Sequence, residues 1–219
     1  MVARLTLDRD ERLDRFGVGL PGGALCVIEG EFGTGKSIIG QRIVYGLLKN
    51  GSRVTVVSTE LTTMHFIEQM HSLDYHIEEF VFSRNLLFLP VYPVLGFRGK
   101  KTDLMDRLLN AKKMYDADVI VIDAFSSLVK DWMKAMPPET PKQQINQRIE
   151  DALYLFKLLN SRGRSVILTL QPGDMPDEIS SVLKAAADVY LTLKLDIVGG
   201  VFSRSVFVRR FSRAEKVVA

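Results

Sequence analysis

Long apolar runs alternate with amphipathic stretches along most of the chain. Runs dominated by Val, Ile and Leu are typical of parallel strands that are covered on both faces, and they occur here at residues 24–29, 53–58, 119–123 and 165–170. Between the first two runs, apolar residues recur at helical spacing from Ile38 to Leu48, and Asn50-Gly51 supplies a helix stop. The alternation predicts an α/β fold with a mostly parallel sheet flanked by helices.

Three more helices are predicted by the same spacing. The first begins at Thr62 or Thr63, the second near Thr102, and the long third one follows Pro141 and ends near Arg162-Gly163. We expect residues 125–141 to form a loop. The final third of the chain predicts a β-hairpin, with strands at 188–195 and 205–211 and a turn at Gly199-Gly200. Because no linker or repeat interrupts this order, we expect a single domain over residues 1–219.

Composition changes this picture little. The 219 residues carry a formal charge of +3, which is too small to indicate the dense basic patch of a nucleic-acid-binding protein. The only cysteine, Cys26, lies in an apolar run and is expected to be a buried hydrophobic residue. No stretch has the apolar length of a signal peptide or a membrane span. We therefore expect a soluble cytoplasmic protein.

Residues 30–37 carry the clearest chemical signal. They read Gly30-Glu31-Phe32-Gly33-Thr34-Gly35-Lys36-Ser37, which fills every fixed position of the phosphate-binding pattern G-x-x-x-x-G-K-[ST]. The glycines let successive backbone N–H groups point at phosphate oxygens, and the following helix adds its positive end. Lys36 would face the β and γ phosphates, and Ser37 would ligate Mg²⁺. We predict binding of ATP and Mg²⁺; the alternative is a glycine-rich turn with an incidental lysine.

An acidic partner for this loop is expected at the end of a buried strand. The segment Asp118–Asp123 supplies four apolar residues followed by a carboxylate. A buried strand seldom ends in a charge unless an ion or hydrogen bond satisfies it. Asp123 is therefore predicted to bind Mg²⁺ with Ser37, while Asp118 caps the strand start in solvent.

Hydrolysis also needs a group that orients the attacking water, and a neutral amide at a strand end can detect whether the γ-phosphate is present. Glu60 follows the second strand, at the edge of the sheet that faces the phosphates and beside the phosphate-loop strand if the two are neighbours. It is predicted to be the catalytic base, with Lys36 and Asp123 as the other catalytic residues; the alternative is a glutamate at a helix entry. Thr59 is either a phosphoryl acceptor or a strand-end threonine. Gln171 ends the 165–170 strand and is either a γ-phosphate sensor that contacts nucleotide or a plain polar residue.

Other charged and aromatic residues leave alternatives open. Arg204, Arg209, Arg210 and Arg213 could reach a neighbour's nucleotide or protect an edge strand. We expect no zinc site, because His65 and His71 do not share a helix face and no cysteine accompanies the histidines. Trp132 is expected to serve in loop packing or an interface. With Lys130 and Lys134 beside it, Trp132 leaves contact with single-stranded DNA open.

The order of these motifs resembles the RecA superfamily, and most closely its KaiC-like branch. The lead-in Leu13–Gly23, the phosphate loop and Ser58-Thr59-Glu60 carry the resemblance. Within that branch, Gly-Glu-Phe-Gly-Thr-Gly-Lys-Ser and Val-Ser-Thr-Glu-Leu-Thr resemble the archaellum accessory family typified by FlaH (ArlH).

The resemblance implies a RecA-like P-loop NTPase core that forms a hexameric ring with nucleotide near the subunit interfaces. It also implies work with the archaellum motor ATPase FlaI at the membrane, as a nucleotide-dependent assembly switch with slow or no ATP hydrolysis. The sequence departs from the family in two ways. Arg209 and Phe211 stand at the places of a Lys-x-Arg pair that reaches across the interface, so the pair is only half present unless Arg210 substitutes. In addition, there is only one ATPase domain. The alternative function is a RecA/RadA-like DNA-dependent ATPase.

Overall fold

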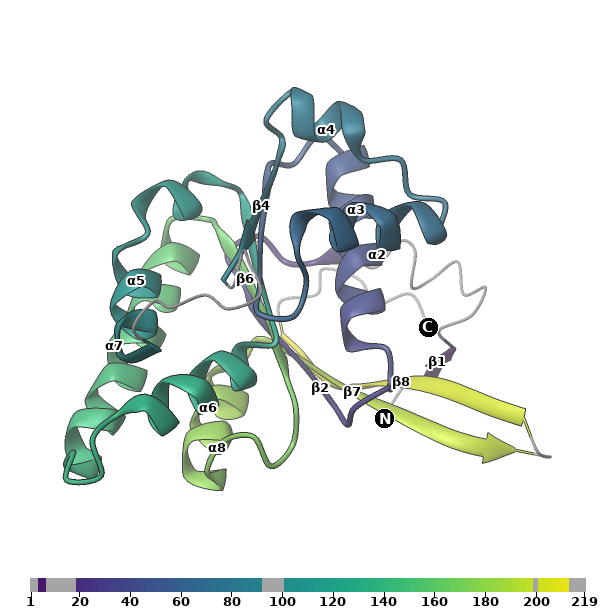
Figure 1. Ribbon diagram of the computed structural model, residues 1–219. Helices are drawn as coiled ribbons and strands as arrows, with labels where there is room; N and C mark the ends of the chain where they lie inside the picture. Colours follow the sequence, from purple (N-terminus) through teal and green to yellow (C-terminus); the bar gives the residue numbers. More distant parts are fainter. Residues whose placement is uncertain (1–3, 7–18, 92–100, 199–200, 213–219) are drawn as a thin grey trace.

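A single mixed sheet of eight strands forms the centre of the molecule. The computed structural model describes residues 4–6, 19–91, 101–198 and 201–212 (Figure 1). The strand order is β1-β8-β7-β2-β6-β5-β3-β4. Strands β7, β2, β6, β5, β3 and β4 are parallel, and the antiparallel pairs β7–β8 and β8–β1 close one side. The strands are β1 (Arg4–Thr6), β2 (Leu25–Gly30), β3 (Val54–Ser58), β4 (Leu86–Pro90), β5 (Val119–Asp123), β6 (Ser165–Leu170), β7 (Val189–Val198) and β8 (Val201–Phe211).

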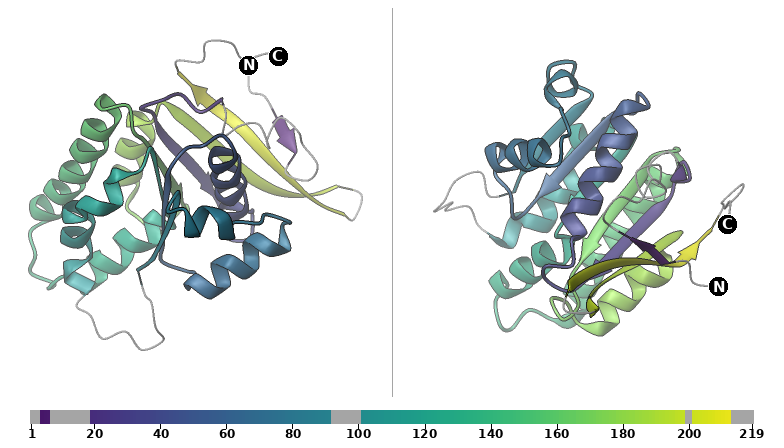
Figure 2. Two further views of the ribbon diagram at one scale, coloured as in Figure 1. Left: turned by 90° about the horizontal axis from the view of Figure 1, so that it is seen from above. Right: turned by 90° about the vertical axis from the view of Figure 1, so that its right-hand side faces the viewer.

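Helices cover both faces of the sheet. Figures 1 and 2 show α2, α3 and α4 on one face and α5, α6, α7 and α8 on the other. The helices are α2 (Lys36–Lys49), α3 (Thr63–Ser72), α4 (Glu78–Phe82), α5 (Leu104–Asn110), α6 (Phe125–Ala135), α7 (Lys142–Ser161) and α8 (Asp177–Ala186), with 3-10 turns at Lys101–Asp103 and Lys112–Asp116. This arrangement confirms the predicted α/β class.

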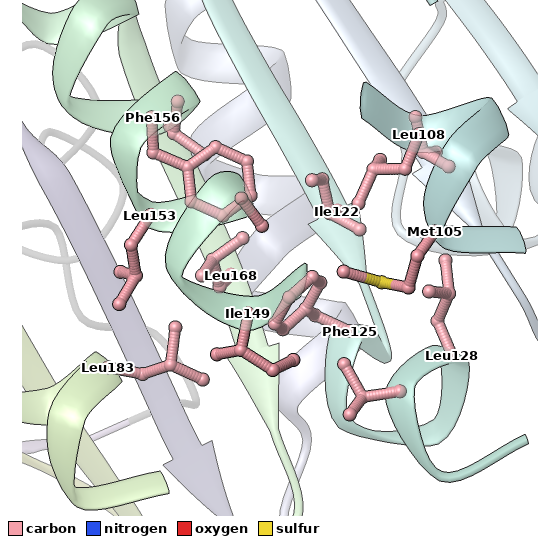
Figure 3. Close-up of a cluster of buried hydrophobic side chains, with 14 of the residues drawn as sticks. Met105, Leu108, Ile122, Phe125, Leu128, Ile149, Leu153, Phe156, Leu168 and Leu183 are labelled. Carbon is pink, nitrogen blue, oxygen red and sulfur yellow. The ribbon is translucent and has the colours of Figure 1, made fainter. Parts of the chain in front are cut away.

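The two faces bury separate hydrophobic clusters because side chains alternate along each strand. In β2, Leu25 and Val27 join the cluster under α5–α8, whereas Cys26 and Ile28 join the one under α2–α4. The first cluster is drawn in Figure 3, where the rings of Phe125 and Phe156 meet edge to face with centroids 6.0 Å apart. Cys26 is fully buried, and burial raises the pKa of its thiol. It is the inert hydrophobic residue that the sequence predicted.

The structure confirms the four buried strands, the antiparallel pair near the C-terminus and the helices after Thr62, Thr102 and Pro141. The expected loop at 125–141 is wrong, because α6 fills residues 125–135. Its apolar residues Phe125, Leu128, Val129 and Trp132 follow helical spacing and are buried. Strand β4 and helices α4 and α8 were not predicted. The turn at Gly199-Gly200, residues 13–18 of the lead-in, and Arg213 lie outside the described residues.

The C-terminal strand also differs from the expectation of an exposed edge. The short strand β1 pairs with β8 opposite Ser205, Val206 and Phe207. Charges on β8 therefore do not protect a bare edge at these positions. Among the described residues, no helix has the length and apolar character needed to cross a bilayer.

Candidate nucleotide site

The loop between β2 and α2 has the backbone geometry that a phosphate cradle needs. Gly33 and Gly35 adopt φ of 78° and 94°, a left-handed conformation that favours glycine. The Thr34 hydroxyl and the Lys36 Nζ donate to the Glu31 carbonyl oxygen at 2.8 and 2.9 Å. These bonds hold the loop curled over the start of α2.

The N-terminus of α2 is suited to an anion. Within Lys36–Lys49, which the structure describes throughout, the first turn has no acidic side chain, and Gly35 supplies no side-chain cap. The first N–H groups of a helix lack intrahelical partners and carry its positive dipole end. A phosphate bound by the loop would supply acceptors for these groups.

Asp123 ends β5 in the interior, with 7% of its surface exposed. Its Oδ1 accepts a hydrogen bond from the Thr169 hydroxyl at 2.8 Å, and its carboxylate also accepts from the Ser37 hydroxyl. Burial raises the pKa of Asp123, while these hydrogen bonds and the charge of Lys36 oppose the rise. The buried carboxylate and the Ser37 hydroxyl thus lie in contact, so both oxygens could ligate one Mg²⁺ ion.

Glu60 lies near the same site because the strand that precedes it, β3, is next to β5 in the sheet. Strand β3 is not a neighbour of β2; it pairs with β5, and Ser58 lies opposite Asp123. The buried Ser58 hydroxyl accepts from the N–H groups of Glu60 and Leu61 at 3.2 and 3.1 Å, which fixes the turn after β3.

The charges of Lys36, Glu60 and Asp123 influence one another. Desolvation raises the pKa of the Glu60 carboxyl, Asp123 adds to the rise and Lys36 opposes it. Desolvation lowers the pKa of Lys36, against the attraction of both carboxylates. The three residues predicted from sequence as catalytic are therefore gathered at one place.

Gln171 lies just beyond β6, with its backbone N–H bonded to the Ser126 hydroxyl at 2.9 Å. Ser126 also donates to Asp174 at 3.3 Å, and Lys130 Nζ donates to the other oxygen of Asp174 at 2.6 Å. Only 5% of the Asp174 side chain is exposed, and its charge acts on both Lys36 and Glu60. Gln171 is thereby attached to the first turn of α6.

Sequence reasoning missed Thr169 and Asp174. Thr169 was a weak signal, as a polar residue inside an apolar strand. Asp174 follows the turn at Pro172-Gly173, where a solvated carboxylate is ordinary, so its burial depends on α6 packing against that turn. Thr59 places its hydroxyl in the interior, where Oγ1 has no hydrogen-bond partner among the described residues.

The arginines of β8 contact their own chain. Arg204 Nε donates to the Gly33 carbonyl oxygen at 3.4 Å. Arg209 donates to Thr192 at 3.0 Å and lies over the ring of Phe207. A β-bulge at Arg209 turns Arg210 toward the end of α8. There its Nη1 donates to the carbonyl oxygens of Lys184, Ala185 and Ala187 at 2.9–3.0 Å.

Two other expectations from the sequence, on Trp132 and on the histidines, differ from the structure. Trp132 is 2% exposed within the core under α6, and Lys130 is paired with Asp174. They are therefore not parts of a loop. His65 lies apart in the first turn of α3, but His71 lies beside His76 and Glu78. The expectation of no zinc site rested on His65 and His71. The pair to consider was His71 and His76.

Comparison with known proteins shows the family of the chain. A family described as "ATPase: KaiC" matches residues 11–217. The archaeal flagellar ATP-binding protein FlaH of Methanocaldococcus jannaschii is 33% identical over 97% of this chain and 87% of its own. FlaH of Methanococcus voltae is 29% identical over the same shares.

Solved structures of proteins with the same names have a similar fold. The crystal structure of flagellar accessory protein FlaH from M. jannaschii superposes with a TM-score of 0.81, covering 98% of this chain and 90% of that one, at 33% identity. A KaiC-like protein from Pyrococcus horikoshii gives a TM-score of 0.67 over 90% and 83% of the two chains at 16% identity, which shows a shared fold.

Proposed function

The chain belongs to the KaiC family of ATPases and, within it, to the FlaH group, and from this premise we propose that it is an ATP-binding regulatory component of the archaellum motor. One observation carries the proposal. A phosphate loop in which Ser37 contacts the buried Asp123 lies in a chain related over 97% of its length to a protein named for ATP binding in the archaeal flagellum.

Each site residue has a role in this proposal. Residues 30–37 hold the phosphates of ATP, with Lys36 neutralising the β and γ groups. Ser37 and Asp123 hold Mg²⁺, which supplies charge neutralisation at the phosphates when bound. Glu60 orients the attacking water. Gln171 contacts the γ-phosphate, and a shift of Gln171 moves α6 through the hydrogen bond to Ser126. We propose that residues 1–219 act as one domain.

Turnover is proposed to be slow, so that the bound nucleotide acts as a signal. Fast hydrolysis in a ring needs cations from the neighbouring subunit to stabilise charge on the γ-phosphate. Among the arginines that the structure describes on β8, Arg209 is exposed and donates to a single side chain, Thr192, whereas Arg210 donates to three carbonyl oxygens at the end of α8, so Arg209 is proposed as this cation. A single trans-acting cation supports weak catalysis.

The proposed assembly is a hexameric ring in the cytoplasm, held at the cell membrane by the motor. Its partner is the motor ATPase FlaI, and ATP-bound and ADP-bound rings are proposed to differ in affinity for it. The switch therefore predicts different complexes in the two nucleotide states.

The experiment is binding of purified FlaI to this protein, measured by interferometry with ATP, ADP or no nucleotide. Glu60→Gln keeps ATP uncleaved, and Lys36→Ala serves as the nucleotide-free control. We expect FlaI affinity to change with nucleotide in the wild type and to stay constant in Lys36→Ala. Equal affinity in all states would refute the switch.

The DNA-dependent ATPase alternative loses the feature that favoured it. Its aromatic and basic residues were placed in a loop, but Trp132 is buried and Lys130 is paired with Asp174. Base stacking needs exposed aromatic rings. Salt-dependent binding of single-stranded DNA that raises phosphate release would restore this alternative.

A further inference from the structure

The corner between α3 and α4 brings together imidazoles and carboxylates that the nucleotide site does not use. His71 lies in the last turn of α3, His76 in the connection, and Glu78 begins α4. Asp74 reverses the chain between them with φ of 62°, a conformation uncommon outside glycine. The buried side chains of Met70 and Ile77 anchor the corner on both sides.

The ligand atoms of His71, His76 and Glu78 all lie within 4.8 Å of one another. His71 Nε2 contacts Glu78 Oε1, and the two imidazole rings meet edge to face with centroids 5.4 Å apart. His76 Nε2 lies 3.4 Å from Asp74 Oδ1, which offers a fourth oxygen. From this geometry we propose a transition-metal site at the α3–α4 corner, with Zn²⁺ as its best-fitting ion.

The chemistry of the donors selects the ion. Two imidazole nitrogens and a carboxylate oxygen form a ligand set that Zn²⁺ accepts in tetrahedral sites, with water or Asp74 in the fourth position. Hard ions such as Mg²⁺ and Ca²⁺ prefer oxygen ligands alone. The carboxylates of Glu78 and Asp74 balance the charge of a divalent ion bound by neutral histidines.

A simple ion pair accounts for less of the corner. A pair between His71 and Glu78 is complete without a second imidazole, and exposed pairs of this kind add little to stability. A bound metal ion explains why His76 also lies within coordinating distance of His71 and Glu78. The bound ion would fasten α3, which begins just after Glu60, to α4.

The test is metal binding to the nucleotide-free protein, which leaves the Mg²⁺ site without its phosphate ligands. Zn²⁺ is titrated calorimetrically, and Co²⁺ is followed by its visible absorption, which reports coordination geometry. We expect one ion per chain. We expect His76→Ala and His71→Ala to weaken Zn²⁺ binding by about tenfold or more, since even groups that only orient a ligand contribute 10–100-fold.

The third histidine supplies a matched control. His65 is exposed on α3, and His65→Ala should leave the affinity for Zn²⁺ unchanged. Cys26 is buried and does not compete. The side chain of His76 is 68% exposed, so its removal leaves the fold intact. Absence of binding, unchanged affinity in His76→Ala, or an equal loss in His65→Ala would overturn the proposal.

Discussion

Gly30 is the last residue of β2, where the phosphate loop begins and where Thr34 and Leu193 leave no room for a side chain. A Cβ added there would lie 2.5 Å from Thr34 Oγ1, 3.0 Å from the Leu193 Cβ and 3.2 Å from the Leu193 carbonyl oxygen. Thr34 is 2% exposed, and its hydroxyl is bonded to the Glu31 carbonyl oxygen at 2.8 Å. Gly30→Ala therefore forces Thr34 to move and lose that bond.

The size of the effect follows from these contacts. Overpacking a close site costs about 1–3 kcal/mol, and a lost internal hydrogen bond about 1 kcal/mol. We expect Gly30→Ala to lower the free energy of unfolding by about 2–4 kcal/mol. It should also weaken ATP binding, because Thr34 and Lys36 both anchor to Glu31.

Gly40 gives the matched control, because the same substitution should act in the opposite direction. It lies inside α2, and among the described residues no atom beyond its chain neighbours and the adjacent helix backbone lies within 4 Å of a Cβ built there. Gly40→Ala should raise the free energy of unfolding by about 0.5–1 kcal/mol through helix propensity. Urea denaturation of the nucleotide-free proteins measures both changes.

Thr34→Ala tests the cause directly, since it removes the closest atom. In the double variant with Gly30→Ala, the summed single effects should exceed the measured loss. A Gly30→Ala protein as stable as the wild type, or strict additivity in the double variant, would refute this account of the loop.

Three further predictions concern charges. Lys36→Ala should abolish binding of a fluorescent ATP analogue, whereas Glu60→Gln should keep binding and abolish phosphate release; normal affinity in Lys36→Ala would contradict the cradle. Asp123 has a raised folded pKa, so its ionisation costs stability as pH rises above about 4. Nucleotide-free Asp123→Asn should therefore gain stability relative to wild type between acid and neutral pH, with loss of Mg²⁺-dependent ATP binding; a constant difference in unfolding free energy would contradict this sign. Arg210→Ala should lower the free energy of unfolding by about 1–2 kcal/mol in urea denaturation, because three carbonyls at the end of α8 lose the hydrogen bonds from this guanidinium; no change would mean that water replaces it.

The parts of the fold that sequence predicts are those with local signals. The phosphate loop and Asp123 can be read from a few consecutive residues, since strand, turn and helix start follow each other directly. Helix α6 was readable as well, because Phe125, Leu128, Val129 and Trp132 share one face. It was missed because it follows β5 after the single residue Ala124, which adopts φ of 56° and forms no side-chain cap.

Other features depend on which segments become neighbours in space. The position of Glu60 beside Asp123 requires the order β5-β3, which sequence does not supply. The burial of Asp174 requires α6 to pack on the turn after β6. The bulge at Arg209 decides that Arg210 contacts α8, and the metal-ligand cluster at His71 depends on the reversal at Asp74. None of these has a local sequence signal.

The most direct test of the nucleotide switch is the mass of the protein in solution with ATP, ADP and no nucleotide, measured by light scattering beside phosphate release. We predict a ring that forms with ATP, little phosphate release, and a different mass without nucleotide. The same mass in all three states under full ATP occupancy, or rapid phosphate release, would contradict a slow nucleotide-dependent assembly switch.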